Sequence, residues 1–232
     1  MKPYFQTDLV TLYFGDCLEV MADLKDSSID CVITDPPYSE RTHKNAKKNG
    51  SKGYGVKLVH FDSFTEENLY SVYAELGRLT KGWVVSNMDY SHAFAFEENP
   101  PQGLVQKRIG VWVKNNPMPQ ISGDRPAQGW EAISYMHKEG IKSSWNAGGL
   151  PGNYVSNLAK PTGHPTPKPL AMVTSWVERF TNTGEIILDP FAGGGTSLMA
   201  ARNLGRKSIG VEIDEKYCEL IANRLSQEAF VF

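Results

Sequence analysis

The chain has 232 residues, of which 41% are hydrophobic, and its 24 basic and 26 acidic side chains leave a net charge of −2. This length suits one domain with a sizeable core. No apolar run approaches the roughly 18 residues of a membrane helix, and the first residues lack a signal-peptide pattern. Because Cys17, Cys31 and Cys218 are odd in number and lack Cys-Xaa-Xaa-Cys spacing, we expect reduced thiols in a cytoplasm and no metal site.

The apolar pattern alternates between strands and helices along the chain. Continuous apolar runs predict buried strands, and apolar side chains at helical spacing, such as Leu69, Val72 and Leu76, predict amphipathic helices. In chain order, we predict a strand at 11–14, a short helix after Cys17, a strand at 29–33, a helix at 66–79, strands at 83–86, 109–113 and 132–136, a helix at 168–180, a strand at 186–188, a helix from Thr196 through Leu204, a strand at 208–213 and a helix at 214–225. This alternation predicts a doubly wound α/β fold with a mostly parallel sheet and helices on both faces.

The tetrapeptide Asp35-Pro36-Pro37-Tyr38 directly follows the apolar run 29–33. At the end of a buried parallel strand it would face the crevice in which open α/β sheets bind ligands. The carboxylate can accept from an amine N–H, the prolines offer carbonyl acceptors without donors, and Tyr38 offers a face for stacking. These groups suit a base flipped out of DNA. The alternative is an ordinary proline-rich turn.

A basic loop at 39–60 follows the tetrapeptide. From Glu40 to His60 there are six Lys or Arg residues and one acid, which gives net +5 and leaves −7 for the rest of the chain. Cations beside the tetrapeptide can neutralise DNA phosphates and release counterions, although solvated loops often have this composition. The position of the loop favours DNA contact through Arg41, Lys44, Lys47, Lys48 and Lys52.

The segment 186–197 reads as a strand, a glycine-rich turn and the start of a helix. This arrangement is typical of nucleotide-cofactor sites. Gly193 and Gly195 match the first two glycines of the dinucleotide pattern GxGxxG, but Leu198 occupies the third position. Glu212, on the next strand, can accept from both hydroxyls of a ribose. The pattern therefore predicts a nucleoside-containing cofactor and argues against a dinucleotide.

Taken together, these motifs resemble the DNA methyltransferases that modify exocyclic amines, in the permuted order called the β group. In that group the catalytic tetrapeptide precedes the cofactor loop, as it does here. The resemblance covers nearly the whole chain, and its individual motifs are short. The further matching segments are Gly15-Asp16-Cys17, Trp112-Val113-Lys114-Asn115, Trp130-Glu131-Ala132-Ile133 and His164-Pro165-Thr166-Pro167-Lys168-Pro169.

The resemblance implies a Rossmann-like domain over 1–232 that uses S-adenosylmethionine. It implies that the loop from Asp189 and Phe191 to Gly195 holds the methionine and ribose side, that Glu212 holds the ribose hydroxyls, and that Asp16 lies near the adenine ring. His164 is expected to fix the loop. The candidates for binding the carboxylate of the cofactor are Thr196, Ser197, Thr166 and Lys168, of which Lys168 has a second interpretation as a solvated charge at a helix start.

The polar stretch 115–161, rich in proline and glycine, is predicted to be irregular. In the β group the sequence-reading segment usually precedes the His-Pro-Thr element, so this stretch is the candidate DNA-recognition insertion. A long surface loop explains it equally well. A homodimer or another partner would add contacts for stringent specificity. The side chains that could reach base edges or stack are Lys142, Ser143, Ser144, Trp145, Asn146, Asn153 and Tyr154.

The expected reaction is direct methyl transfer to an amine of a flipped base in double-stranded DNA, with Asp35, Pro36, Pro37 and Tyr38 as the catalytic residues. An aspartate at the first position is usual in this family for adenine N6, whereas serine is usual for cytosine N4. Cytosine N4 stays an alternative, as does a catalytically inactive DNA-binding relic. RNA and protein-glutamine methyltransferases usually carry Asn at this position and the opposite motif order. A restriction-modification role in a bacterium or a phage would suit such an enzyme.

Overall fold

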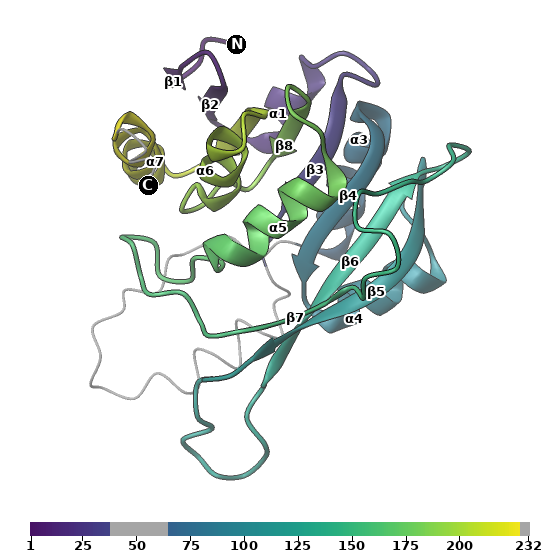
Figure 1. Cartoon of the computed structure of the whole chain (residues 1–232), viewed down its shortest axis with the longest axis vertical. Helices are drawn as coiled ribbons and strands as arrows, with labels where there is room; N and C mark the ends of the chain where they lie inside the picture. Colours follow the sequence, from purple (N-terminus) through teal and green to yellow (C-terminus); the bar gives the residue numbers. More distant parts are fainter. Residues whose placement is uncertain (38–64, 228–232) are drawn as a thin grey trace.

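The computed structural model describes residues 1–37 and 65–227, and the part it describes is an α/β fold (Figure 1). One nine-stranded sheet runs through these residues. Its strands are β1 Phe5–Gln6, β2 Val10–Phe14, β3 Ile29–Thr34, β4 Thr80–Met88, β5 Leu104–Lys114, β6 Trp130–Lys138, β7 Asn153–Ser156, β8 Ile186–Asp189 and β9 Lys207–Glu212. The helices are α1 Cys17–Ala22, α3 Glu66–Leu79, α4 Tyr90–Glu98, α5 Leu170–Phe180, α6 Thr196–Asn203 and α7 Glu215–Ser226.

The sheet has the order β1-β2-β9-β8-β3-β4-β6-β5-β7, and all its strands run in one direction except β1 and β6. This confirms the doubly wound, mostly parallel sheet. From β3 the chain continues to β4 on one side and later returns through β8 on the other side. The topological switch point therefore lies between β3 and β8. Open α/β sheets bind ligands in the crevice outside the carboxyl ends of the strands at such a point.

Helices cover both faces of the sheet (Figure 1). The side chains of α1, α3 and α4 form one core with strands β3, β4, β6, β8 and β9. On the opposite face α5 and α6 pack over β3 to β6 and β8, and α7 packs with α6 against β2. Helix α3 could be predicted because its cap and its apolar stripe are both local in sequence. The Thr65 hydroxyl accepts from the Asn68 N–H at 3.2 Å, and the stripe of Leu69, Val72 and Leu76 is buried.

Three elements were not predicted from the sequence. Helix α4 begins at the Asp89 cap, whose carboxylate accepts from the Ser91 N–H, and its residues show no clear apolar stripe at helical spacing. Strands β1 and β7 are short, and their sequences carry little apolar alternation. Their pairing with β2 and β5 is a tertiary effect that local pattern does not encode.

The stretch 115–161 is irregular apart from two strands, of which one was predicted at 132–136 and the other was not predicted. Strands β6 and β7 lie within it, so only 115–129, 139–152 and 157–161 are outside the sheet. The loop 115–129 joins β5 to antiparallel β6 at the edge where the parallel strands end. The loop 139–152 lies at the opposite edge. The candidate recognition stretch therefore reaches two different ends of the molecule.

The residues proposed to read bases in loop 139–152 are bound to the far end of the sheet. The Trp83 indole, near the start of β4, donates to the Ser144 carbonyl at 2.6 Å. The Trp145 ring packs against Phe180 with a centroid distance of 5.4 Å. The Asn146 amide donates to the Thr181 carbonyl at 3.0 Å, at the end of α5. These contacts favour a structural role for residues 144–146.

The composition of the chain led to expectations about its cysteines, membrane helices and metal ligands. Cys17, Cys31 and Cys218 are free and buried. In the part of the chain that the structure describes, no helix is long and apolar enough to cross a membrane. In that same part, no group of three or more His, Cys, Asp and Glu side chains is arranged to hold a metal ion.

Candidate active site

The candidate site follows the carboxyl edge of the sheet. Because the strands from β2 to β4 are parallel and adjacent, the residues that end them meet at this edge. Strand β6 is antiparallel, so it reaches the edge with its first residues, and Ala132 pairs there with Met88 of β4. The acids placed along the edge are Asp16 after β2, Glu212 at the end of β9, Asp189 at the end of β8, Asp35 after β3 and Glu131 at the start of β6.

The turn after β3 presents Asp35 to the crevice. Its side chain is 30% exposed, and its Oδ2 lies 2.5 Å from the Lys168 ammonium. Pro36 is buried and Pro37 half-buried, so the turn is anchored on the core side. Tyr38 lies outside the described residues, and its predicted stacking role stays a prediction.

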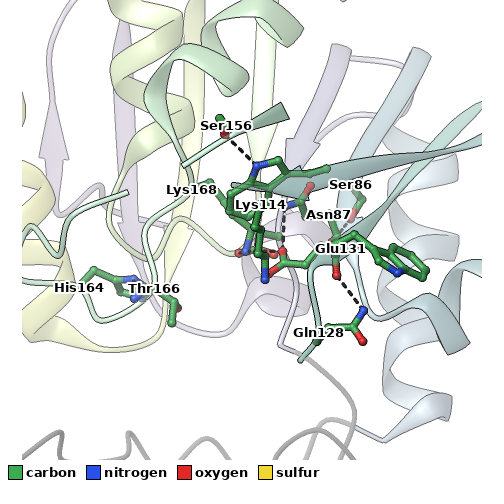
Figure 2. A network of polar contacts seen from close by, with 12 residues as sticks. Ser86, Asn87, Lys114, Gln128, Glu131, Ser156, His164, Thr166 and Lys168 are labelled. Atoms are coloured by element: carbon green, nitrogen blue, oxygen red, sulfur yellow. Dashed lines mark hydrogen bonds and ion pairs between the residues drawn. The ribbon is translucent and has the colours of Figure 1, made fainter. Parts of the chain in front are cut away.

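Lys168 belongs to a row of alternating charges (Figure 2). Its Nζ lies 3.5 Å from Oε2 of Glu131, and Oε1 of Glu131 is 2.6 Å from the Lys114 Nζ. The Asn87 side-chain amide donates to Oε2 of Glu131 at 3.3 Å. The Lys114 ammonium also lies 5.2 Å from the centre of the Trp112 ring. The ends of β4, β5 and β6 thus support the cation that binds Asp35.

Lys168 stays charged although it is buried. Burial alone would lower the pKa of its ammonium, but the neighbouring carboxylates of Asp35 and Glu131 outweigh burial, so the pKa is raised above its ordinary value. An ammonium between two carboxylates satisfies the buried charges on both sides.

A buried hydrogen bond joins the turn after β3 to the glycine-rich loop. The Thr34 hydroxyl donates to Oδ1 of Asp189 at 2.8 Å. The Phe191 N–H donates to the same oxygen at 3.1 Å, and the Ser197 hydroxyl donates to Oδ2. Burial raises the pKa of Asp189 to about 6, against the lowering effect of these donors. Asp189 therefore organises the loop from inside.

The glycine-rich loop has backbone conformations and contacts that exclude larger side chains. Gly193 and Gly195 have φ angles of +51° and +76°, in the left-handed region that favours glycine. A Cβ at Gly195 would lie 3.0 Å from Cγ1 of Ile221. A Cβ at Gly193 would lie 3.2 Å from Nε2 of His164. The loop is thus held between α7 and the segment that leads to α5.

His164 acts as a neutral packing residue beside this loop. Its ring meets Tyr217 edge-on at 4.8 Å, and the Thr166 N–H donates to its Nδ1 at 3.4 Å. Burial, followed by the positive charges of Lys168 and Arg224, lowers the pKa of His164 to about 4. The Arg224 guanidinium donates to the Gly194 carbonyl. These contacts support the predicted loop-fixing role of His164.

Glu212 is joined to the glycine-rich loop by a hydrogen bond. Oε2 of Glu212 accepts from the Gly193 N–H at 2.7 Å, and Oε1 accepts from the Asp214 N–H at 2.9 Å. The residue is 6% exposed, and burial raises the pKa of its carboxyl. Each carboxylate oxygen has a further lone pair that can accept from a ribose hydroxyl. The Gly15 N–H donates to the Glu212 carbonyl at 3.0 Å, which brings Asp16 beside this acid.

The predicted cofactor-binding residues differ in their exposure and in their contacts within the protein. Ser197 is buried and donates to Asp189, so its hydroxyl is already used within the protein. Thr196 is the first residue of α6 and is also buried. Thr166 is exposed, whereas Lys168 contacts Asp35. The predicted DNA-binding residues Arg41, Lys44, Lys47, Lys48 and Lys52 all lie outside the described residues.

Three charged or polar residues of the site were not predicted to be functional. Glu131 and Lys114 lie in segments that match the family, but no local pattern pairs them with Asp35. Asn87 was not singled out at all. The available signal was that Asn87 and Lys114 lie at the carboxyl ends of apolar strands, which in a parallel sheet indicates the ligand edge. Glu131 lies at the start of an antiparallel strand and carries no such signal.

The chain matches a protein-family model described as DNA methylase over residues 29–224. Among curated proteins, it is 25% identical to the type II methyltransferase M.HinfI of Haemophilus influenzae, over 98% of this chain and 71% of that protein.

Solved structures agree with this match. The M1.HpyAVI–SAM complex superposes with a TM-score of 0.72 and is 28% identical, covering 94% of this chain and 100% of that one. The cytosine-N4-specific PvuII DNA methyltransferase has a TM-score of 0.74, with 100% and 91% coverage. At 16% identity, that likeness concerns the fold alone.

Proposed function

The chain belongs to the DNA methylase family, and from this premise we propose that it methylates the N6 amine of adenine in double-stranded DNA. It is an S-adenosylmethionine-dependent DNA methyltransferase by family, so the chosen amine and the residues that act on it are the proposed part. The observation that carries the proposal is the 2.8 Å hydrogen bond from Thr34 to Asp189. It ties the turn that carries Asp35 to the glycine-rich loop, as transfer between two adjacent ligands requires.

Residues on β8 and β9 are proposed to hold the methyl donor. When bound, S-adenosylmethionine supplies an electrophilic methyl group on a sulfonium sulfur. Glu212 is assigned to the ribose hydroxyls because its buried carboxylate lies beside the glycine-rich loop. The loop from Phe191 to Gly195 lines the methionine and ribose side, and Asp16 lies toward the adenine ring. Asp189 acts indirectly, by fixing the loop.

Asp35 is proposed to receive the amine of the flipped base. The lone pair of an aromatic amine is delocalised into the ring, so the amine is a poor nucleophile. Hydrogen bonds from its N–H groups to the Asp35 carboxylate and the Pro36 carbonyl favour a more tetrahedral nitrogen, whose lone pair can point at the methyl group. The carboxylate need not take a proton before attack. The N–C bond would form as the S–CH3 bond breaks, the cofactor would leave as a neutral thioether, and the acidic methylated cation would then lose its N–H proton to water. Alignment and electrostatics then supply most of the catalysis.

Adenine is favoured over cytosine by the aspartate at position 35, on the family pattern described above. The relationship to the cytosine-specific PvuII enzyme is one of fold, so it does not favour cytosine here. A catalytically inactive relic is disfavoured because Asp35, Lys168 and Glu131 are assembled into one ion-pair network.

DNA contact is proposed at the carboxyl edge of the sheet. The loop 115–129 lies at this edge, as does the segment 157–169 between β7 and α5. The basic residues at 39–60 directly follow the catalytic turn in sequence. Loop 139–152 is left out of the interface because residues 144–146 are bound at the opposite edge. The sequence-reading part is therefore narrowed to 115–129 and 157–161.

The setting and assembly of the enzyme are also proposals. Similarity to a relative named a type II methyltransferase supports a role in restriction-modification, in the cytoplasm of a bacterium or a phage-infected host. The recognition loops at the site edge are short, so a second copy of the chain is the proposed source of further DNA contacts.

Nucleoside mass spectrometry tests the proposed function. Unmethylated double-stranded DNA is incubated with the protein and S-adenosylmethionine, digested and analysed, with Asp35→Ala as the control. N6-methyladenine in the wild-type sample alone supports the proposal. N4-methylcytosine would overturn the choice of base and keep the mechanism. No methylated base on DNA of varied sequence would overturn the proposal in favour of a binding role.

A further inference from the structure

Lys168 is the central cation of the base-binding half of the site. Its side chain is only 12% exposed and lies between Asp35, at 2.5 Å, and Glu131, at 3.5 Å. Lys168 comes from the segment just before α5, Asp35 follows the last residue of β3, and Glu131 lies at the start of β6. Figure 2 shows Lys168, Glu131 and Lys114 converging from separate elements.

We infer that Lys168 is a positioning residue for methyl transfer, which acts by fixing the Asp35 carboxylate, and that Glu131 holds it in place. The inference rests on the proposed role of Asp35 and replaces the expectation that Lys168 binds the carboxylate of the cofactor. The contacts of Lys168 support this change, because its ammonium is already placed between two protein carboxylates.

An ammonium on Oδ2 is compatible with an amine bound to the same carboxylate. An ionised carboxylate has about four lone-pair positions, so a charge-assisted bond at one oxygen leaves capacity for further donors. The cation also fixes the plane of the carboxylate and makes it a weaker base. Such a carboxylate suits a group that accepts hydrogen bonds and aligns the amine, and it does not suit a group that removes a proton first.

Glu131 makes this placement stable. Its two oxygens contact Lys114 and Lys168, and the Asn87 amide adds a hydrogen bond. The row Asp35, Lys168, Glu131 and Lys114 contains two acids and two bases, so its formal charges cancel. Removal of Lys168 would leave two carboxylates facing each other without their shared cation, which is strongly unfavourable at a buried site.

The experiment compares wild type with Lys168→Met, Lys168→Arg, Glu131→Gln and Asp35→Ala. Lys207→Met is the matched control, because Lys207 is exposed at the opposite end of β9. Single-turnover transfer is measured with saturating DNA and S-adenosylmethionine, and cofactor binding is measured by calorimetry. We expect Lys168→Met to slow transfer by about 100-fold, as for a misplaced catalytic group. Cofactor affinity should stay within about threefold, and Lys168→Arg should recover part of the rate, because it keeps the cation.

Thermal unfolding from pH 4 to pH 8 supplies a readout independent of activity. Lys168→Met should be most destabilised near pH 8 and should approach wild type near pH 4, where protonation neutralises the carboxylates that have lost their cation. Lys207→Met should follow wild type at every pH. Among the residues that the structure describes, the titratable and charged groups that face Lys168 and Asp35 include Glu131 on β6, Lys114 on β5, Asp189 on β8, Tyr73 on α3 and His164 before α5.

The outcomes separate the inference from the proposed function. If Lys168→Met bound the cofactor more weakly but kept a normal rate at saturation, Lys168 would again be assigned to cofactor binding, and the inference would be overturned. A normal rate in Lys168→Met beside an inactive Asp35→Ala would also overturn it, while the role of Asp35 stands. An active Asp35→Ala would overturn the proposed function itself. If Lys168→Met does not fold, Glu131→Gln decides, and a wild-type rate in that variant would overturn the inference.

Discussion

The cofactor half and the base half of the site are assembled over very different distances along the chain. In the cofactor half, Asp189 binds Phe191 and Ser197, two and eight residues away, and Glu212 binds Gly193, 19 residues away. In the base half, Lys168 binds Asp35 from 133 residues away. The first half depends on local backbone conformation, whereas the second depends on which strands the sheet places side by side. Substitutions in the cofactor half should therefore lower cofactor affinity, whereas substitutions in the base half should lower the rate of methyl transfer.

Gly195→Ala should give the largest loss in the cofactor half. A side chain at φ +76° is strained by about 1–3 kcal/mol, and its Cβ would lie 3.0 Å from Cγ1 of Ile221. We expect the loop to shift and cofactor affinity, measured by calorimetry, to fall by about 100-fold, the equivalent of roughly 2.7 kcal/mol. Gly140→Ala is the control, with φ +74° and open space around the added Cβ. Equal loss of affinity in both variants would contradict the close packing of the loop.

Glu212→Gln should give a smaller loss in the same half. The amide keeps one carbonyl oxygen but loses the charge that strengthens hydrogen bonds from ribose hydroxyls and from the Gly193 N–H. We expect cofactor affinity to fall about tenfold, the equivalent of one strong hydrogen bond, with a nearly normal rate at saturating cofactor. Steady-state kinetics at varied cofactor concentration measures both. A reduced saturated rate with unchanged affinity would place Glu212 in the base half instead.

Arg125→Ala should have a modest effect on DNA binding, and Lys142→Ala should have none. Arg125 is half-exposed in loop 115–129 at the site edge, whereas Lys142 lies in loop 139–152 at the far edge. Loss of one phosphate contact should lower the slope of log affinity against log salt by about 0.9. Fluorescence anisotropy at several salt concentrations measures this slope. A larger effect at Lys142 would contradict the proposed DNA-binding edge.

His164→Gln should give the smallest effect, a change in the acid sensitivity of the fold. The pKa of folded His164 is lowered to about 4, while an unfolded histidine titrates near 6.5. Between these values the unfolded state binds more protons, so the stability that neutral His164 contributes is present above about pH 6.5 and is lost as pH falls toward 4. Wild type should therefore lose more stability than the variant between pH 7.5 and pH 4.5.

Chemical denaturation at both pH values measures this difference. Asp189, whose pKa is raised to about 6, titrates in the same window with the opposite sign, but it is present in both proteins and cancels in the comparison. Parallel pH dependence in the two proteins would show that His164 is not buried as a neutral ring.

Most of the fold could be predicted because its elements carry their own signals. The apolar stripe of α3, the buried run of β3 and the glycine turn before α6 are visible in the sequence. Helix α4 has no clear stripe, and β7 exists because it pairs with β5. Within 115–161 the apolar run at 132–136 predicts β6, whereas the polar segments around β7 conceal that short strand.

The same distinction applies to the site. Glu212 beside Gly193 follows from the strand, glycine turn, helix and strand order, so sequence spacing predicts it. The contact of Lys168 with Asp35 depends on how the segment before α5 crosses the edge of β3, which no local spacing specifies. The second contact of Lys168, with Glu131, also requires that β6 runs antiparallel to β4, because only then does the start of β6 reach this edge.

The most direct test of the account is to measure cofactor binding and methyl transfer in the same preparation of Asp35→Ala. We expect calorimetric affinity for S-adenosylmethionine within about threefold of wild type and single-turnover transfer lower by about 10²–10³-fold, the usual effect of losing a preorganised electrostatic contact. Transfer at the wild-type rate, or loss of transfer together with cofactor binding, would contradict the division of the site into a cofactor half and a base half.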